Sequence, residues 1–145
     1  MNVKANDGNV LLLRGAALWL LAALVLAWCL VGLGFGMAPF KAVFAGKFSR
    51  LLQAHLDFLL MTALILGVHA VGVSLPWHVR WAMVVGAFTN SSLFLAMAIS
   101  PALDNPQVPP PALFNAYVFA SILTTSYGFG KAAVLVLRST FAPRL

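Results

Sequence analysis

The sequence predicts an all-α integral membrane protein, a four-helix bundle that crosses the lipid bilayer. Of its 145 residues, 62% are hydrophobic and 8% are charged, and none is glutamate. A chain with so few polar side chains cannot cover a water-soluble globule, so lipid is its natural solvent. Its apolar residues form four runs near or above the ~20 residues that cross a hydrocarbon core. Charged residues or prolines separate these runs, so each run is expected to be one helix.

The four spans are expected at residues 10–36, 51–73, 77–99 and 111–137. The first run is too long for the apolar core of a signal peptide and lacks an Ala-x-Ala cleavage pattern before the next charges, so it is expected to remain as a helix. The proline-rich stretch 103–111 separates the last two spans, because prolines cannot extend a helix. Nothing in the composition marks a further domain, so residues 1–145 are expected to form a single membrane domain.

The basic residues indicate membrane topology rather than a nucleic-acid partner. The formal net charge is +6, but Lys and Arg lie at span ends and form no basic stripe interleaved with aromatic residues. One side of the expected bundle carries Lys4, Arg14, Arg80, Lys131, Arg138 and Arg144, and the other carries Lys41, Lys47 and Arg50. The positive-inside rule therefore predicts a multi-pass protein of the cell's inner membrane with both termini in the cytoplasm.

An ionisable pair, His55 and Asp57, lies near the start of the second span. Ionisable side chains within a membrane are candidate functional groups by default. Two residues along a helix separate side chains by ~200°, so Asp57 is expected to meet a different neighbour from His55. A lipid-exposed carboxyl costs ~2.5–3.5 kcal/mol at mid-bilayer, so Asp57 should face the bundle. The residue pattern leaves two roles open for it, a structural hydrogen bond and a catalytic proton transfer.

His55 is a candidate metal ligand, because neutral imidazole is the commonest protein ligand for transition metals. Lys47 and Arg50 lie within about two helical turns of it, and two cations beside an imidazole suit an anionic cofactor. The alternative is an interfacial histidine that hydrogen-bonds a neighbouring carbonyl. His69 and His78, near the opposite boundary, are expected to be solvated.

The third span carries one amide, Asn90, in a column of apolar and small residues that also contains Met83, Gly86, Phe94 and Met97. An amide in lipid needs a hydrogen-bond partner. Asn90 is therefore expected either to hydrogen-bond another helix or to position a ligand.

The fourth span carries polar and small residues at roughly helical spacing, namely Tyr117, Ser121, Thr124, Thr125 and Gly128. This pattern predicts a face that points inward or toward another subunit. The single cysteine, Cys29, permits no intramolecular disulfide and lies in no haem-attachment or zinc motif, so it is expected only to pack.

Three short motifs together resemble a known family. Ala54-His55-Leu56-Asp57 opens the second span, Gly86-Ala87-Phe88-Thr89-Asn90 lies in the third, and Pro101 ends it. In these motifs and in span order, from about Leu11 to Arg138, the chain resembles the small four-helix membrane isomerases, the family of styrene oxide isomerase and hydroxylaminobenzene mutase.

The resemblance implies a homotrimer with b-type haem at each subunit interface and with His55 as the axial ligand of the iron. In styrene oxide isomerase, ferric iron acts as a Lewis acid on the epoxide oxygen, and a 1,2-shift then gives an aldehyde. Carried over to this sequence, Asn90 matches the asparagine that lines the substrate pocket. We add the hypothesis, from their spacing to His55, that Lys47 and Arg50 bind the haem propionates.

The chain departs from the epoxide isomerases at three pocket positions. They have an asparagine where this chain has Met61, an aspartate where it has Gly86, and a tyrosine where it has Phe94. The mutases are closer, because they resemble His-Leu-acid in the second span and have glycine at the position of Gly86, although they share the asparagine that Met61 replaces. The more apolar pocket predicts a different substrate, or none.

The leading hypothesis is a haem-dependent, isomerase-like protein that acts on a small apolar substrate, such as an epoxide or arylhydroxylamine, arriving from the bilayer. In this hypothesis His55 is the metal ligand, and Asn90 and Asp57 are the candidate catalytic residues. A second hypothesis is a non-catalytic haem protein, either a redox relay or a gas sensor. A third is a small proton-coupled transporter in which Asp57 carries the proton.

Overall fold

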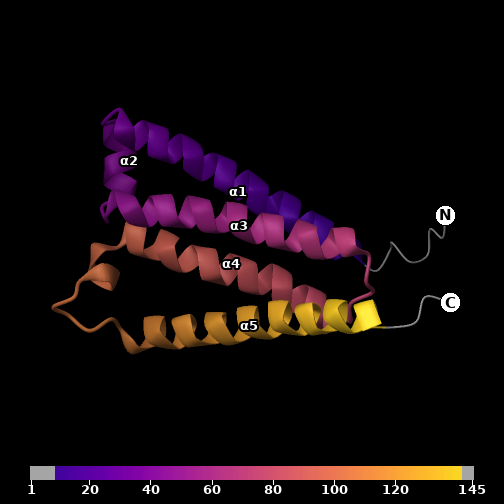
Figure 1. Ribbon diagram of the computed structural model, residues 1–145. Coiled ribbons are helices and arrows are strands. Elements are labelled where there is room, and N and C mark those ends of the chain that lie inside the picture. Colours follow the sequence, from indigo (N-terminus) through magenta and orange to yellow (C-terminus); the bar gives the residue numbers. More distant parts are fainter. Residues whose placement is uncertain (1–8, 142–145) are drawn as a thin grey trace.

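The computed structural model describes residues 9–141, and within this range the chain is all-helical, with no strand, as predicted. The elements in chain order are α1 (Val10–Gly34), α2 (Ala38–Val43), α3 (Phe48–Val71), α4 (Trp77–Ile99), the 3₁₀ helix η3 (Pro101–Asp104) and α5 (Ala112–Phe141) (Figure 1). Lys4 and Arg144, which the topology prediction counts, lie outside the described residues.

In the described part of the chain, four helices, α1, α3, α4 and α5, are long and apolar enough to cross a membrane, so the chain is a multi-pass membrane protein by this criterion. α4 occupies the expected residues, whereas α3 begins three residues early at Phe48, α1 ends at Gly34 and α5 continues to Phe141. Gly72, which adopts a φ of 74°, ends α3. The sequence analysis did not predict α2. Its start is favoured by Pro39 in its first turn.

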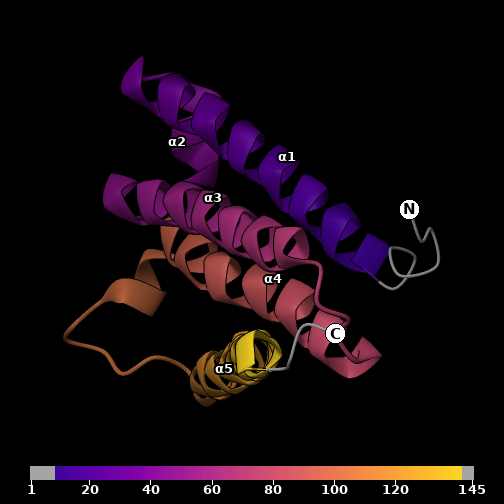
Figure 2. The ribbon, with the colours of Figure 1, turned by 45° about the vertical axis from the view of Figure 1, so that its right-hand side comes forward.

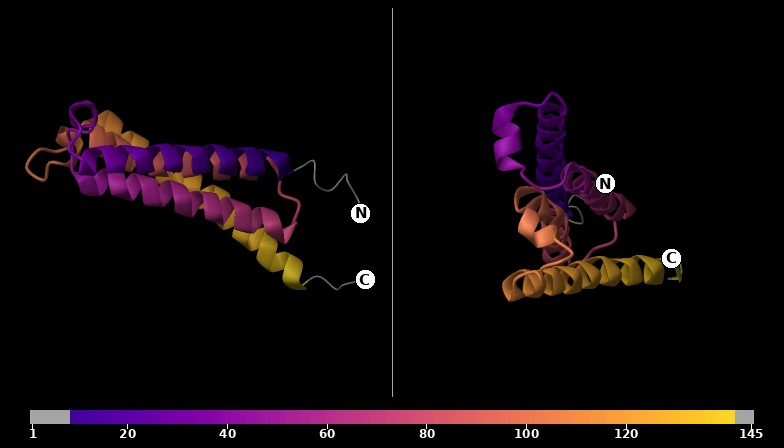
Figure 3. Two further views of the ribbon diagram at one scale, coloured as in Figure 1. Left: turned by 90° about the horizontal axis from the view of Figure 1, so that it is seen from above. Right: turned by 90° about the vertical axis from the view of Figure 1, so that its left-hand side faces the viewer.

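The four long helices pack in chain order. α1 lies against α3, α3 against α4 and α4 against α5, while α5 contacts α3 only slightly. α1 and α3 are splayed apart where α2 joins them, and they converge toward the end that holds the start of α1 and the end of α5 (Figure 1, Figure 2). Seen end-on, α5 runs along one side of the other helices (Figure 3). α5 is therefore attached to the bundle mainly through α4.

Two buried apolar clusters hold α1, α3 and α4 together. The cluster nearer the chain ends includes Leu12, Ala16, Ile65, Val79 and Met83, and the other includes Ala23, Leu26, Leu51, Ala54 and Phe58. Trp19 packs against both clusters, and its indole N–H donates to the carbonyl of Val84 at 3.1 Å. This tryptophan therefore links α1 to α4 across the middle of the bundle.

Hydroxyl groups and small residues make the close contacts between α5 and α4, and Phe129 and Leu135 of α5 pack against the core cluster at its far end. The buried residues of α5 are all small: Ser121, Gly128 and Ala132. Three contacts form a row that we call the polar seam: Thr125 donates to the Gly86 carbonyl at 2.9 Å, Ser121 donates to the Thr89 hydroxyl at 3.1 Å, and the Ser92 and Tyr117 hydroxyls lie 2.7 Å apart. Interhelical hydrogen bonds and close approach at small residues are what associate helices in lipid. The polar face of the fourth span thus points inward, toward α4.

Candidate functional site

The carboxyl group of Asp57 lies between two donors on the neighbouring helix. Asp57 projects from α3, and its Oδ2 accepts hydrogen bonds from Asn90 Nδ2 at 2.9 Å and from Ser91 Oγ at 2.7 Å. Asn90 and Ser91 are consecutive residues of α4, with Asn90 partly buried and Ser91 fully buried. The two residues expected to need partners, Asp57 and Asn90, therefore satisfy each other.

The Ser91 hydroxyl can form a hydrogen bond with Asp57 whether Asp57 is ionised or protonated. Its oxygen lies 2.7 Å from Asp57 Oδ2 and 3.0 Å from the Ala87 carbonyl, but it has one hydrogen to donate. When Asp57 is ionised, Ser91 donates to the carboxylate. When Asp57 is protonated, the carboxyl can donate to Ser91, which then donates to Ala87. The cluster can accordingly hold or release a proton without leaving a buried polar atom unpaired.

A groove opens beside this cluster on the surface formed by α3 and α4. It encloses about 220 Å³ and is lined by Gln53, Leu56, Asp57, Leu60 and Phe94. Leu56 and Leu60 are more than half exposed, at 54% and 56%, so this wall faces outward rather than into the core. A small apolar molecule entering from the bilayer would meet leucine and phenylalanine side chains and one carboxyl group.

His55 lies on the other flank of α3, against α1. Its Nδ1 is 2.8 Å from the carbonyl oxygen of Ala23. A carbonyl only accepts hydrogen bonds, so Nδ1 carries a proton, and in the neutral form of the ring the lone pair is on Nε2. The carbonyl contact is the alternative that the sequence leaves open for this residue. It does not compete with ligation, because metal-bound histidines usually donate their other N–H in this way.

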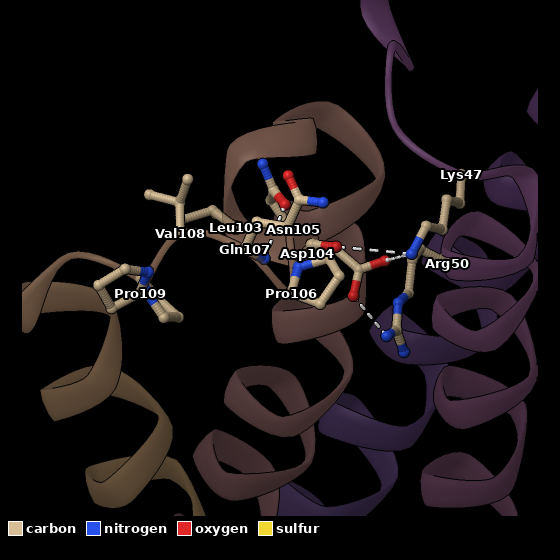
Figure 4. Close-up of a pocket in the computed structure, with 10 residues that line it drawn as sticks. Lys47, Arg50, Leu103, Asp104, Asn105, Pro106, Gln107, Val108 and Pro109 are labelled. Atoms are coloured by element: carbon tan, nitrogen blue, oxygen red, sulfur yellow. Dashed lines mark hydrogen bonds and ion pairs between the residues drawn. The ribbon is translucent and has the colours of Figure 1, made fainter.

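Lys47 and Arg50 converge on Asp104 of η3 at the end of the bundle near α2. The Lys47 ammonium lies 2.9 Å from Asp104 Oδ2, and the Arg50 guanidinium lies 2.5 Å from Oδ1 (Figure 4). The Arg50 hydrogen bond, followed by the Lys47 bond, holds the pKa of Asp104 far below its ordinary value. Because one carboxylate faces two cations, the cluster of Lys47, Arg50 and Asp104 keeps a net charge of about +1, which can attract a further anion.

We expect this contact to stabilise the fold only while Asp104 is ionised. Its pKa in the fold is depressed below the ordinary value of 3.8, so its contribution is present above that value and is lost as the pH falls through the lower pKa. The stability difference between the parent and Asp104→Asn should stay constant from about pH 7 to about pH 5 and shrink in strongly acidic buffer. Thermal unfolding in detergent measures it. A difference that already shrinks above pH 5 would contradict the assignment.

The three positions that depart from the epoxide isomerases lie in three different environments. Met61 is buried in the apolar core cluster with Leu12 and Ala16. Gly86 lies in the polar seam, where an added Cβ would come within 2.8 Å of the Thr125 backbone, so a larger residue does not fit. Phe94 lines the Asp57 groove. Only the change at Phe94 alters the wall of this groove.

Sequence reasoning missed two residues of these clusters. Ser91 could have been suspected, because it follows Asn90 within an apolar span and a buried hydroxyl there needs an acceptor. Asp104 was not singled out, and nothing in the sequence indicates that it pairs with residues more than fifty positions away. His69, expected to be solvated, is partly buried, and its Nδ1 has no partner in the described part of the chain.

Within residues 9–141, no three His, Cys, Asp or Glu side chains converge on one point, so side chains alone do not form a metal cage there. Haem iron needs no such cage, because the porphyrin supplies the equatorial ligands and a single histidine suffices as axial ligand. His55, with its Nε2 lone pair on a partly exposed ring, fits that requirement.

Comparison of the chain with protein-family models, curated proteins and solved structures finds no match.

We expect Asp57 and Ser91 to be energetically coupled. In a double-mutant cycle with Asp57→Leu and Ser91→Ala, each single change removes one partner of the Ser91–Asp57 hydrogen bond, and the double change should cost less than the sum. The expected coupling is about 1 kcal/mol, the upper part of the range for hydrogen bonds between membrane helices. Reversible unfolding in mixed micelles measures it. Strictly additive effects would show that the contact contributes nothing.

Proposed function

We propose that this chain is a haem b-binding membrane protein of isomerase type, which acts on a small apolar substrate such as an epoxide or an arylhydroxylamine. The observation that carries the proposal is the hydrogen bond from His55 Nδ1 to the Ala23 carbonyl, which leaves Nε2 as a free lone pair on a partly exposed ring. The motif resemblance supports the same residue as the axial ligand.

The positions of His55 and Asp57 favour a site shared between subunits. His55 contacts α1 and Asp57 contacts α4, so the two side chains lie on opposite flanks of α3. One chain cannot direct both at the same ligand. In a homotrimer, a ring of identical contacts can place His55 of each subunit opposite the Asp57 groove of the next. Haem between subunits, as the resemblance implies, would then have its ligand on one side and the groove on the other.

The groove residues supply the chemistry other than that of the iron. Haem bound at His55 would provide Lewis-acid chemistry for an epoxide or hydroxylamine oxygen. The Asp57 carboxyl, which keeps its hydrogen bonds in both protonation states, holds or accepts a proton. Asn90 fixes the orientation of that carboxyl through its amide. Leu56, Leu60 and Phe94 give the groove an apolar wall that suits an apolar substrate.

Lys47 and Arg50 remain our candidates for the haem propionates. Both lie at the α2 end of α3, where Asp104 neutralises about one of their two charges. A propionate there would share the two cations with Asp104 or displace it. Unchanged haem retention in a Lys47→Ala, Arg50→Ala double variant would remove them from the site.

For topology we propose that both termini face the cytoplasm in the cell's inner membrane. The start of α1 and the end of α5 lie at the same end of the bundle (Figure 1). Among the described residues, that end carries Arg14, Arg80, Lys131 and Arg138, and the opposite end carries Lys41, Lys47 and Arg50. The bias has the sign that the positive-inside rule requires. Reporter fusions to each terminus test it.

Subunit mixing tests the shared site. A His55→Ala chain and an Asp57→Asn, Asn90→Ala chain, carrying different tags, are co-expressed, and oligomers that contain both are purified. In a mixed trimer only one of the three interfaces joins an intact His55 to an intact groove, so about one third of the parental turnover should return. A site built within one chain would give none. Turnover is measured with epoxides and arylhydroxylamines as candidate substrates.

A second candidate function, a non-catalytic haem protein, is favoured by the apolar wall at Phe94. The Asp57 groove offers few polar groups to a substrate, which suits a gas sensor or a redox relay as well as an isomerase. Dithionite reduction followed by carbon monoxide separates these uses. An open sixth position on the iron fits gas sensing or Lewis acidity, whereas a second protein ligand fits electron transfer.

A further inference from the structure

A second groove lies between α1 and α4, in the half of the bundle nearer the chain ends. It encloses about 380 Å³, and it shares no lining residue with the Asp57 groove. Its walls are apolar and aromatic, with Leu18, Trp19, Trp81, Val85 and Phe88 among them, and Arg14 is the one charged side chain that lines it. The function proposed above makes no use of this groove.

The inner part of the groove offers only apolar surface. α1 and α4 touch directly at Gly15, where an added Cβ would lie 2.6 Å from a Val84 methyl group. Trp19 uses its only polar atom within the bundle, in the hydrogen bond to the Val84 carbonyl, and its ring stacks on Phe88 with centroids 5.0 Å apart. With no hydrogen-bonding group left to present, this part suits a hydrocarbon chain.

The mouth of the groove carries a positive charge that the described chain does not neutralise. Arg14 is exposed in the second turn of α1, and no carboxylate in residues 9–141 forms an ion pair with it. The two carboxylates of that range are engaged elsewhere, Asp57 with Asn90 and Ser91, and Asp104 with Lys47 and Arg50. Neither carboxylate of residues 9–141 is therefore available as a counter-ion for Arg14.

We propose that this groove binds an acyl chain of an anionic phospholipid whose phosphate group lies at Arg14. A guanidinium binds phosphate with two parallel hydrogen bonds, and the half-exposed Trp81 at the same mouth has the amphipathic character typical of the headgroup level. A second copy of the chain fits less well, because its described residues at this end are also cationic. A neutral apolar substrate would leave the charge unmatched.

Tryptophan quenching by brominated lipid tests the proposal. The chain has four tryptophans, and Trp28 and Trp77, at 74% and 68% exposed, can be changed to phenylalanine so that Trp19 and Trp81 report from the groove. The protein is reconstituted in vesicles that contain equal fractions of brominated phosphatidylglycerol or brominated phosphatidylcholine. We expect stronger quenching by the phosphatidylglycerol. Arg14→Gln should lower this preference about fivefold, the effect of one cation near the membrane surface.

Two further variants separate the possible outcomes. Arg138→Gln removes a cation from the same end of the bundle but outside the groove, and it should keep the preference. Val85→Phe should fill the groove and reduce quenching by both lipids. Equal quenching by the two lipids in the parent, or a preference that survives Arg14→Gln, would overturn the proposal. Absence of quenching by either lipid would also overturn it, because another occupant then covers the groove.

Discussion

Replacement of His55 with alanine is expected to abolish haem binding. An axial histidine is the one protein bond to the iron that the chain offers in the proposed site, and even changes to the groups that orient such ligands lower metal affinity by about 10–100-fold. The Soret absorbance per chain of the detergent-purified variant should therefore fall at least tenfold. A pyridine haemochrome assay on the same sample counts the b-type haem that remains.

Two matched histidine variants serve as controls for this result. His69→Ala and His78→Ala remove an imidazole from the opposite end of the bundle, where His78 stacks on Tyr127. Both variants should keep the parental haem content. If His55→Ala retains haem, the axial assignment fails. If the parent is colourless even after haemin is supplied, the cofactor proposal fails as a whole, while the Asp57 cluster keeps its hydrogen bonds and becomes the place to test a proton-coupled carrier.

Gly128→Ala is expected to be the most destabilising single methyl addition in α5. A Cβ at Gly128 would lie 2.6 Å from the backbone nitrogen of Met83 and 2.7 Å from the carbonyl carbon of Ala82. These are backbone atoms of α4, so neither can rotate out of the way, and the two helices must separate. Overpacking of this kind costs ~1–3 kcal/mol, and separation also weakens the hydrogen bonds of the polar seam.

Gly130→Ala is the matched control, two residues along the same helix. Nothing lies within 4 Å of a Cβ at this position, and alanine is the better helix former by up to ~1 kcal/mol. This variant should be neutral or slightly stabilised. The difference in thermal unfolding between the two variants isolates the contact with α4. Equal effects of the two changes would mean that α5 does not approach α4 at Gly128.

Much of the fold follows from the lengths of the apolar runs and from lipid as their solvent. A run of about 20 apolar residues can be satisfied in lipid only as a helix, because every backbone group must be paired internally. This is why α1, α3, α4 and α5 were predictable, and why α4 matches residue for residue. α2 escaped prediction because it is only six residues long, and nothing about crossing a bilayer constrains so short a segment.

Most members of the candidate site were predictable, Ser91 and Asp104 excepted, but their pairings were not. Asp57 and Asn90 each stood out as polar groups that need a partner in lipid, and the structure joins them across 33 residues of sequence. Which partner each would find depends on how α3 and α4 rotate against each other, and apolar patterning fixes that rotation poorly when lipid covers the remaining faces. The sequence also could not predict which ring nitrogen of His55 carries a proton, because the Ala23 carbonyl of another helix determines it.

The polar seam also dictates how far α5 can slide. Its three contacts involve Gly86, Thr89 and Ser92 along α4 and, in reverse order, Thr125, Ser121 and Tyr117 along α5. Lipid solvates apolar side chains as well as a neighbouring helix does, so apolar surface alone would tolerate many docked positions. A shift of one helical turn would leave at least one of these contacts without a counterpart, and it would move Gly86 and Gly128 away from the close backbone approaches that they permit. The hydroxyl contacts and the two glycines together therefore favour one register of α5 on α4.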